Sequence, residues 1–194
     1  MSTVAETVRS WGGQEIIAHE GARKAVAGLI FILAAALGAQ VAVPLPWTPV
    51  PMTLQPLFVI LAGAVLGPML GASAMAGYVA LGAAGLPVFA MGGAGLPWLL
   101  GPTGGYLVAM PAAAFFTGVV AARGAGPVRT AAGLALGVAV MYLGGLSWLV
   151  ASTGAEPGGL LAVAVFPFLL GDATKILLAL FLTRLIRTSS LGRV

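Results

Sequence analysis

The chain carries the sequence LLAVAVFPFLLGDATKILLALFL over residues 160–182. Apart from Asp172 and Lys175, this stretch has no ionisable side chain, and it is long enough to cross the roughly 30 Å hydrocarbon core of a bilayer. A charge at the centre of a membrane helix costs about 2.5–3.5 kcal/mol, so two unpaired charges would cost about 5–7 kcal/mol. At this spacing the two side chains share one helix face and can reach each other. The stretch therefore predicts a membrane helix whose charge pair either holds helices together or holds a ligand.

The rest of the chain has the composition of a helical membrane protein. Of its 194 residues, 60% are hydrophobic and 7% are charged, whereas a typical soluble domain has about 25% charged residues. No Asp, Glu, Lys or Arg occurs from Ala25 to Ala122. These apolar runs are continuous and do not alternate in polarity as the strands of a membrane β-barrel do. The sequence therefore predicts an all-α integral membrane protein without a separate soluble domain.

The length of the chain allows about six membrane spans. We expect them at residues 25–43, 53–66, 70–84, 103–122, 129–152 and 160–186. The second and third spans are short and meet at Gly67 and Pro68, so a tight helical hairpin, a tilted pair and a partly irregular pair are all open. Residues 1–20 lack the apolar core of a signal peptide, so we expect a polar or amphipathic segment lying in water.

The basic residues predict the orientation in the membrane. With the N-terminus in the cytoplasm, eight of the nine Lys and Arg residues lie on the cytoplasmic side, and the ninth is Lys175. Positive residues favour the cytoplasmic side. We therefore expect both termini there, with an N-terminal segment over residues 1–21, a six-helix membrane domain over 22–188 and a tail over 189–194. The net charge of +4 then reflects topology and does not indicate a nucleic-acid partner.

Two apolar loops on the outer side have unusual sequences. Residues 44–51 contain four prolines, which exclude a helix and require an extended or turned chain. Residues 85–106 are rich in glycine and repeat Gly-Leu-Pro at 85 and 95. Irregular backbone near a membrane is tolerated only where protein buries it or where it lines a cavity. The loops are therefore expected either to cap the bundle or to form the roof of an outward-facing pocket.

The side chains available exclude the common kinds of catalysis. The chain has no Cys, and its one His, His19, lies outside the expected spans, so a Ser–His pair or a conventional metal site within the bundle is not expected. No Gly-Lys-Ser/Thr follows the glycine-rich loop, so a Walker phosphate site is not expected either. We therefore expect a protein that is not an enzyme, has no cofactor, and would need another subunit for any ATP-driven process.

Three roles are open for Asp172 and Lys175: a structural ion pair, a proton relay and a ligand site. A relay normally needs further acidic or His groups across the membrane, and none is available. A ligand site for a small, mostly apolar molecule is favoured, because Lys offers three donors and an ionised Asp offers acceptors. Further candidates for the pocket are Gln55, Tyr78, Phe89, Trp98, Tyr106, Tyr142 and Trp148. The aromatic candidates are as well explained by helix packing or an interfacial belt.

Small residues recur at four-residue spacing, for example Ala35 with Ala39 on the first span. Such stripes let two helix backbones approach closely. Most of them indicate packing within the chain, but the stripe on the first span is also a candidate surface for docking another membrane subunit.

Four ordered stretches of the chain are distinctive: PLPWTPVPMTLQ at 44–55, GAAGLPVF at 82–89, LGPTGGY at 100–106 and FLLGDATK at 168–175. Together they resemble the BioY family, the biotin-binding substrate (S) components of energy-coupling factor (ECF) transporters. The resemblance covers residues 24–187. It implies a six-helix S-component fold with a high-affinity biotin pocket near the outer face, closed by the loops after the first and third spans.

The resemblance also implies roles for single residues. Asp172 would accept from the ureido N–H groups of biotin, and Lys175 would bind either the ureido oxygen or the carboxylate. Ala35 and Ala39 would face the ECF transmembrane coupling protein, which works beside two ATPase subunits in the lipid of a bacterial or archaeal cytoplasmic membrane. The alternatives are an S component for another vitamin, such as thiamine or riboflavin, and a non-transporting membrane protein with a structural Asp–Lys pair.

Overall fold

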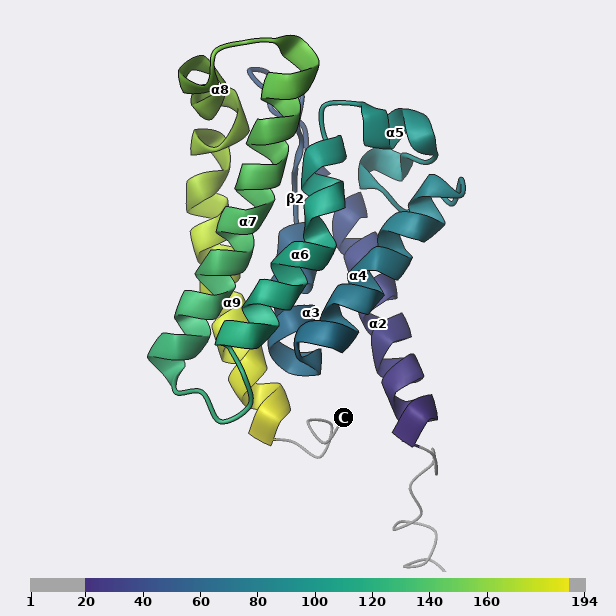
Figure 1. The fold of residues 1–194 in the computed structure, drawn as a ribbon, viewed down its shortest axis with the longest axis vertical. Coiled ribbons are helices and arrows are strands. Elements are labelled where there is room, and N and C mark those ends of the chain that lie inside the picture. The colour runs from purple at the N-terminus through teal and green to yellow at the C-terminus, as the bar shows by residue number, and fades with distance from the viewer. Residues whose placement is uncertain (1–19, 189–194) are drawn as a thin grey trace, which may run out of the picture.

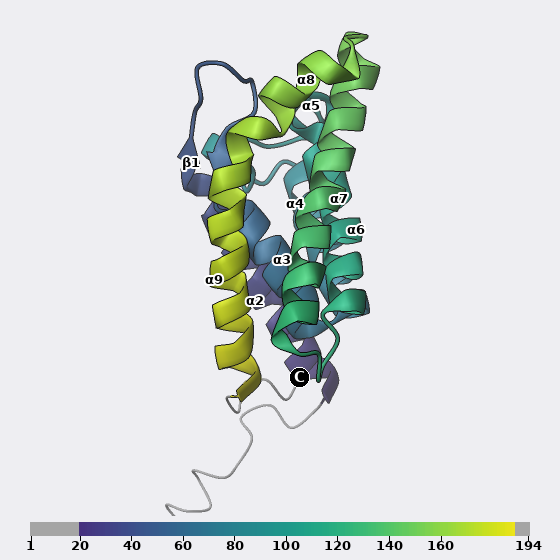
Figure 2. The same cartoon turned by 90° about the vertical axis from the view of Figure 1, so that its left-hand side faces the viewer.

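The computed structural model describes residues 20–188, which form a bundle of helices that run mostly along one long axis (Figures 1 and 2). The helices that correspond in order to the predicted spans are α2 (Glu20–Gln40), α3 (Gln55–Leu66), α4 (Pro68–Ala83), α6 (Gly104–Val120), α7 (Pro127–Thr153) and the pair α8 (Pro157–Ala164) and α9 (Leu169–Thr188). Three stretches are long and apolar enough to cross a membrane, namely Glu20–Gln40, Pro127–Thr153 and Pro157–Thr188, and the other three helices are shorter but apolar. The predicted helical, multi-pass membrane fold is therefore confirmed.

The proline-rich loop forms a turn, one of the two predicted alternatives, in which the Thr48 N–H donates to the Leu45 carbonyl at 3.3 Å. Strands β1 (Ala42–Val43) and β2 (Met52–Thr53) pair antiparallel on either side of it, with Ala42 opposite Thr53. The second loop contains the 3-10 turn η1 (Ala90–Gly92) and the short helix α5 (Leu96–Leu100). Both loops lie at the upper end of the bundle in Figures 1 and 2.

Helices α3 and α4 form the tight hairpin that was one of the predicted alternatives. Gly67 joins them at φ 85°, a conformation that residues with a Cβ rarely adopt, and Pro68 begins α4 with the φ that a first helical turn needs. With 12 residues, α3 is about 18 Å long, well short of the roughly 30 Å of bilayer hydrocarbon. In Figure 1, α4 runs obliquely across the bundle. The hairpin therefore combines a short helix, α3, with a tilted helix, α4.

The last predicted span is one apolar stretch in the structure, Pro157–Thr188, but its helix breaks between α8 and α9. Val165 leaves helical geometry at φ −130° and ψ −60°, and Phe166–Phe168 form the 3-10 turn η2. Pro167 causes the break, since proline has no N–H and its ring clashes with the preceding turn. The hydroxyl of Tyr106 donates to the Ala164 carbonyl at 2.6 Å and so satisfies a backbone acceptor at the break. A new helix, α9, therefore begins just before the charge pair.

The expected docking stripe on the first span does not lie on the surface. Ala35 and Ala39 are both 0% exposed and pack inside the chain, because small residues allow α2 to lie close to α3 and α4. The outward face of α2 carries larger side chains, including Leu29, Leu33 and Leu37. Ala35 and Ala39 therefore serve internal packing and present no surface to a partner in this structure.

Basic residues gather at one end of the bundle. The start of α2, the connection between α6 and α7 and the end of α9 all lie at the lower end in Figure 1. They carry Arg23, Lys24, Arg123, Arg129, Arg184 and Arg187. Glu156 lies at the opposite end, immediately before α8. The predicted terminal segments fall outside the described residues, apart from residues 20 and 21 at the start of α2.

Candidate functional site

A cavity lies between the two irregular loops and the charge pair. Its empty volume is about 580 Å³, the space at its mouth included. It is lined by Val50, Pro51, Thr53, Gln55, Pro56, Ala90, Thr103, Tyr106, Leu107, Met110, Met141, Tyr142, Phe168, Asp172 and Lys175. These residues come from both outer loops and from α3, α6, α7, η2 and α9. The fold thus brings segments that are far apart in sequence to one site near the loop end of the bundle.

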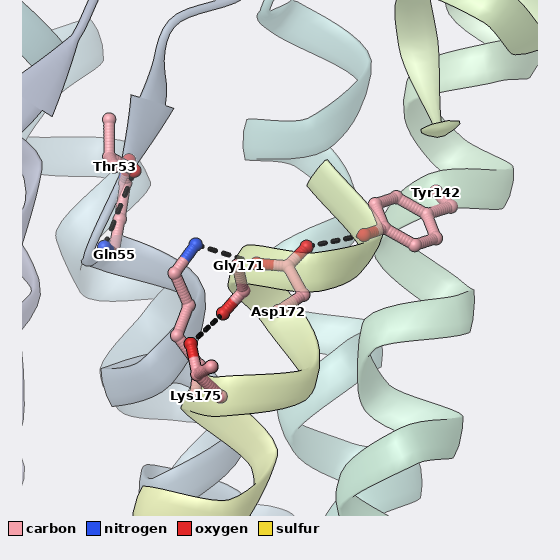
Figure 3. A network of polar contacts seen from close by, with 7 residues as sticks. Thr53, Gln55, Tyr142, Gly171, Asp172 and Lys175 are labelled. Carbon is pink, nitrogen blue, oxygen red and sulfur yellow. Dashed lines mark hydrogen bonds and ion pairs between the residues drawn. The ribbon is translucent and has the colours of Figure 1, made fainter. Parts of the chain in front are cut away.

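The Asp172 carboxylate is bonded at both oxygens (Figure 3). The Lys175 ammonium donates to Oδ1 at 2.6 Å, and the Tyr142 hydroxyl donates to Oδ2 at 2.5 Å. Asp172 is 4% exposed and Lys175 is 6% exposed, so both charges are buried. Because the ion pair lies within one helix, it does not itself connect two helices, and among residues 20–188 only the Tyr142 contact from α7 does so. A purely structural role for the ion pair is therefore weakly supported.

The pair keeps hydrogen-bonding capacity on the cavity side. A Lys ammonium has three donors, and a carboxylate has about four acceptor positions. Within residues 20–188, Lys175 uses one donor and Asp172 uses two acceptor positions. A ligand in the cavity therefore meets adjacent free donors and acceptors of opposite charge. Bonds to charged groups are stronger than neutral ones, and a ligand without matching atoms leaves them unmade.

The first turn of α9 contributes Asp172 to the cavity. Asp172 lies in this turn, where the helix dipole attracts a negative charge. The break at Pro167 is what places this helix end beside the cavity, because an unbroken span would have put Asp172 in the middle of a helix. The proline and the carboxylate therefore act together in building the site.

Gln55 adds an acceptor of fixed orientation at the start of α3. Its Nε2 donates to the Tyr78 hydroxyl at 2.7 Å, and that hydroxyl donates to the Val88 carbonyl at 2.7 Å. Because the single Tyr78 proton goes to Val88, the amide nitrogen of Gln55 must face Tyr78. The Gln55 Oε1 has no partner within residues 20–188 and remains available to a ligand.

The structure brings together five of the nine residues considered for the site. Asp172, Lys175, Gln55, Tyr106 and Tyr142 line the cavity. Tyr78 and Phe89 do not line it.

Those two aromatic residues support the site from behind. Both are fully buried, and their rings meet edge to face with centroids 5.7 Å apart. The two tryptophans considered in the sequence also lie outside the lining, and Trp148 Nε1 donates to the Gly101 carbonyl at 2.9 Å. Tyr78 and Phe89 therefore shape the second loop, which in turn forms one wall of the cavity.

Sequence analysis missed the apolar wall of the cavity. Pro56, Met110, Met141 and Phe168 contribute to it. One signal could have found two of them: Met110 follows Tyr106 by four residues and Phe168 precedes Asp172 by four, so each shares a helix face or turn with a chosen residue. The cavity therefore combines a mostly apolar surface with a few convergent polar groups.

The fold and the cavity define a multi-pass membrane protein that binds a small molecule with both apolar and polar parts. The sequence model of the BioY family matches residues 8–191. The chain belongs to the BioY family. The resemblance seen in the four sequence motifs is thereby confirmed.

Individual relatives agree with this assignment. The chain is 44% identical to the probable biotin transporter BioY of Pyrococcus horikoshii over 146 residues, which cover 75% of this chain and 85% of that protein. It is 42% identical to the biotin transporter BioY of Rhodobacter capsulatus over 171 residues, covering 82% and 90% of the two chains. A crystal structure of the S-component for biotin from an ECF-type ABC transporter has the same fold, with a TM-score of 0.81 at 23% identity over 91% of this chain and 96% of that one.

Proposed function

We propose that this chain binds biotin with high affinity and serves as the substrate-binding subunit of an ECF-type transporter. The observation that carries the proposal is the buried cavity in which Asp172, Lys175 and Gln55 present free donors and acceptors within an apolar wall. The relatives named as biotin transporters support biotin as the ligand.

The chemistry of biotin matches these groups. Its ureido ring has two N–H donors beside one carbonyl acceptor, and the rest of its bicycle is apolar. Asp172 and Lys175 present an acceptor and a donor joined by a 2.6 Å contact, which is the pattern complementary to a ureido N–H and its neighbouring carbonyl. We therefore place the ureido oxygen on Lys175 and one N–H on Asp172. The Gln55 Oε1 is the candidate acceptor for the second N–H.

Transport then requires partners. The chain supplies biotin binding, and a transmembrane coupling protein with two ATPase subunits supplies the energy, in the lipid of a bacterial or archaeal cytoplasmic membrane. The basic end of the bundle faces the cytoplasm in this arrangement, because positive residues near span ends favour that side. The cavity end, with both irregular loops, faces outward and receives biotin.

A binding titration of the purified protein with labelled biotin tests the ligand. We expect saturable binding of labelled biotin to one site. Excess unlabelled biotin should displace the labelled biotin, whereas thiamine and riboflavin should not. Displacement by thiamine or riboflavin at concentrations similar to biotin would assign the site to another vitamin. Absence of saturable biotin binding by folded protein contradicts the proposal.

A further inference from the structure

Gln40, the last residue of α2, holds the second outer loop with both ends of its side-chain amide. Its Nε2 donates to the Phe89 carbonyl at 3.0 Å, and its Oε1 accepts from the Gly92 N–H at 3.0 Å. The same Nε2 also reaches the Ala36 carbonyl of its own helix at 3.2 Å, which fixes the side chain. One side chain thus bonds the residue just before the turn η1 and the last residue of that turn. We call this pair of contacts to the loop the Gln40 clamp.

The clamped turn has an unfavourable backbone conformation. Met91 has φ 56° and ψ 30° and is the only non-glycine residue with positive φ in the described part of the chain. Such residues persist where the surroundings hold them, and they gather at functional sites. The side chain of Met91 is exposed, so packing of that side chain does not hold the turn in place. The Gln40 clamp supports this conformation together with two backbone bonds, from the Phe89 N–H to the Gly93 carbonyl and from the Gly93 N–H to the Ala90 carbonyl.

The turn is also part of the cavity wall. Ala90, its first residue, is buried and lines the cavity. On the inner side the loop is held by the bond from Tyr78 to the Val88 carbonyl, which in turn depends on Gln55. Tyr78 is fully buried, whereas Gln40 is exposed. The outer attachment is thus the one that water can most readily replace.

We propose that Gln40 is a positioning residue that keeps η1 closed over the ligand cavity and so limits the rates of ligand entry and exit. This inference rests on the proposed function for the identity of the ligand. The clamp touches the loop and not the cavity interior, so it holds the loop equally with or without ligand. Weakening it therefore raises both rate constants and leaves their ratio, the Kd, nearly unchanged.

Two substitutions test how much the two bonds of the Gln40 clamp contribute. Gln40→Met keeps the length of the side chain and removes both bonds to the loop. Gln40→Glu keeps the acceptor for Gly92 and removes the donor to Phe89. A net hydrogen bond changes an equilibrium by about two- to tenfold, so we expect Gln40→Met to raise both biotin association and dissociation about tenfold and Gln40→Glu to have a smaller effect. Leu37→Ala, an exposed position one turn earlier on α2, is the matched control with unchanged rates.

The experiment measures both rate constants by stopped flow with fluorescent biotin on purified, folded protein. A parallel rise of both constants with the Kd within about threefold supports the clamp. Unchanged rates overturn it, and so does faster dissociation with unchanged association, which would mean that Gln40 stabilises only the ligand-bound site. If biotin does not bind to the unsubstituted protein, the proposed function is wrong, and the inference about Gln40 fails with it.

A second measurement does not depend on the strength of the clamp. Because the sequence has no Cys, Gln40→Cys together with Met91→Cys introduces a unique pair for a short, cleavable bismaleimide. Cross-linking before biotin is added should block its entry, cross-linking after binding should block its release, and cleavage should restore both. Free exchange of biotin in the cross-linked protein would show that this turn does not control access and would overturn the proposal.

Discussion

Replacing Lys175 by Leu leaves the Asp172 carboxylate buried, 4% exposed, with Tyr142 as its remaining partner. Breaking a buried ion pair by removing one partner typically costs about 3–5 kcal/mol, because an uncompensated charge stays in a poorly hydrated site. For a chain of 194 residues, about 2–4 °C is lost per kcal/mol. We therefore expect Lys175→Leu to lower the apparent unfolding midpoint by about 6–20 °C.

The double substitution Asp172→Leu/Lys175→Leu should be less destabilising than Lys175→Leu alone. It removes both charges together and leaves one partly buried hydroxyl, that of Tyr142, without its acceptor. An unsatisfied polar group of this kind costs about 1–3 kcal/mol. This ordering follows because Lys175→Leu leaves a buried charge without its ionic partner, whereas the double substitution leaves no charge at the site.

For biotin binding, the double substitution should be more damaging than Lys175→Leu alone. The double substitution removes two charge-assisted bonds to the ligand, each worth about 1.5–3 kcal/mol, so we expect the Kd to rise about 150- to 20,000-fold. Unfolding in detergent with and without biotin, together with a binding titration, measures both effects on the same samples. Thr174→Ala is the control, because Thr174 lies between the two residues, is exposed and, within the described part of the chain, bonds only the Gly171 carbonyl; this variant should bind biotin normally. A well-folded double variant that binds biotin with unchanged affinity refutes the site assignment.

Further predictions concern the groups around this pair. Tyr142→Phe removes a donor from Asp172 and should weaken biotin binding about tenfold in a titration while the protein stays folded. Tyr106→Phe leaves the Ala164 carbonyl without its donor at the helix break and should lower the free energy of unfolding by about 1–3 kcal/mol. Arg187→Met removes the bonds from the end of α9 to the carbonyl ends of α3 and α6, so we expect a lower unfolding midpoint with unchanged biotin affinity, because these bonds lie at the end opposite the cavity. A changed affinity would mean that the two ends are coupled.

Much of the fold could be predicted because a bilayer constrains a chain strongly. Continuous apolar runs must satisfy their backbone internally, so six runs predict six helical segments, and prolines within residues 44–51 exclude a seventh. The charge pair could be singled out because charges inside an apolar run are costly. These inferences depend on composition and local spacing, which the sequence states directly.

Which residues line the site is harder to predict from the sequence. Tyr78 and Phe89 were chosen as aromatic residues near the expected pocket, but whether an aromatic ring lines a cavity or fills the space behind it depends on packing distances between helices. Phe89 packs against Gly82, where an added Cβ would collide with its ring. Sequence alone does not say on which side of a wall such a ring lies.

Two further features could not be predicted from the sequence, and the reason is the same for both. The break at Pro167 and the contacts of Gln40 both satisfy irregular backbone with side chains far away in the sequence, at separations of 58 residues for Tyr106 and Ala164 and 52 for Gln40 and Gly92. Hydropathy treats each span as a unit that satisfies its own backbone, so it cannot register such bonds. Irregular backbone at membrane depth is tolerated only in a cavity wall or in buried protein. In a helical membrane protein, the polar side chains that bond broken helices and strained turns are therefore themselves pointers to the rim of the binding site.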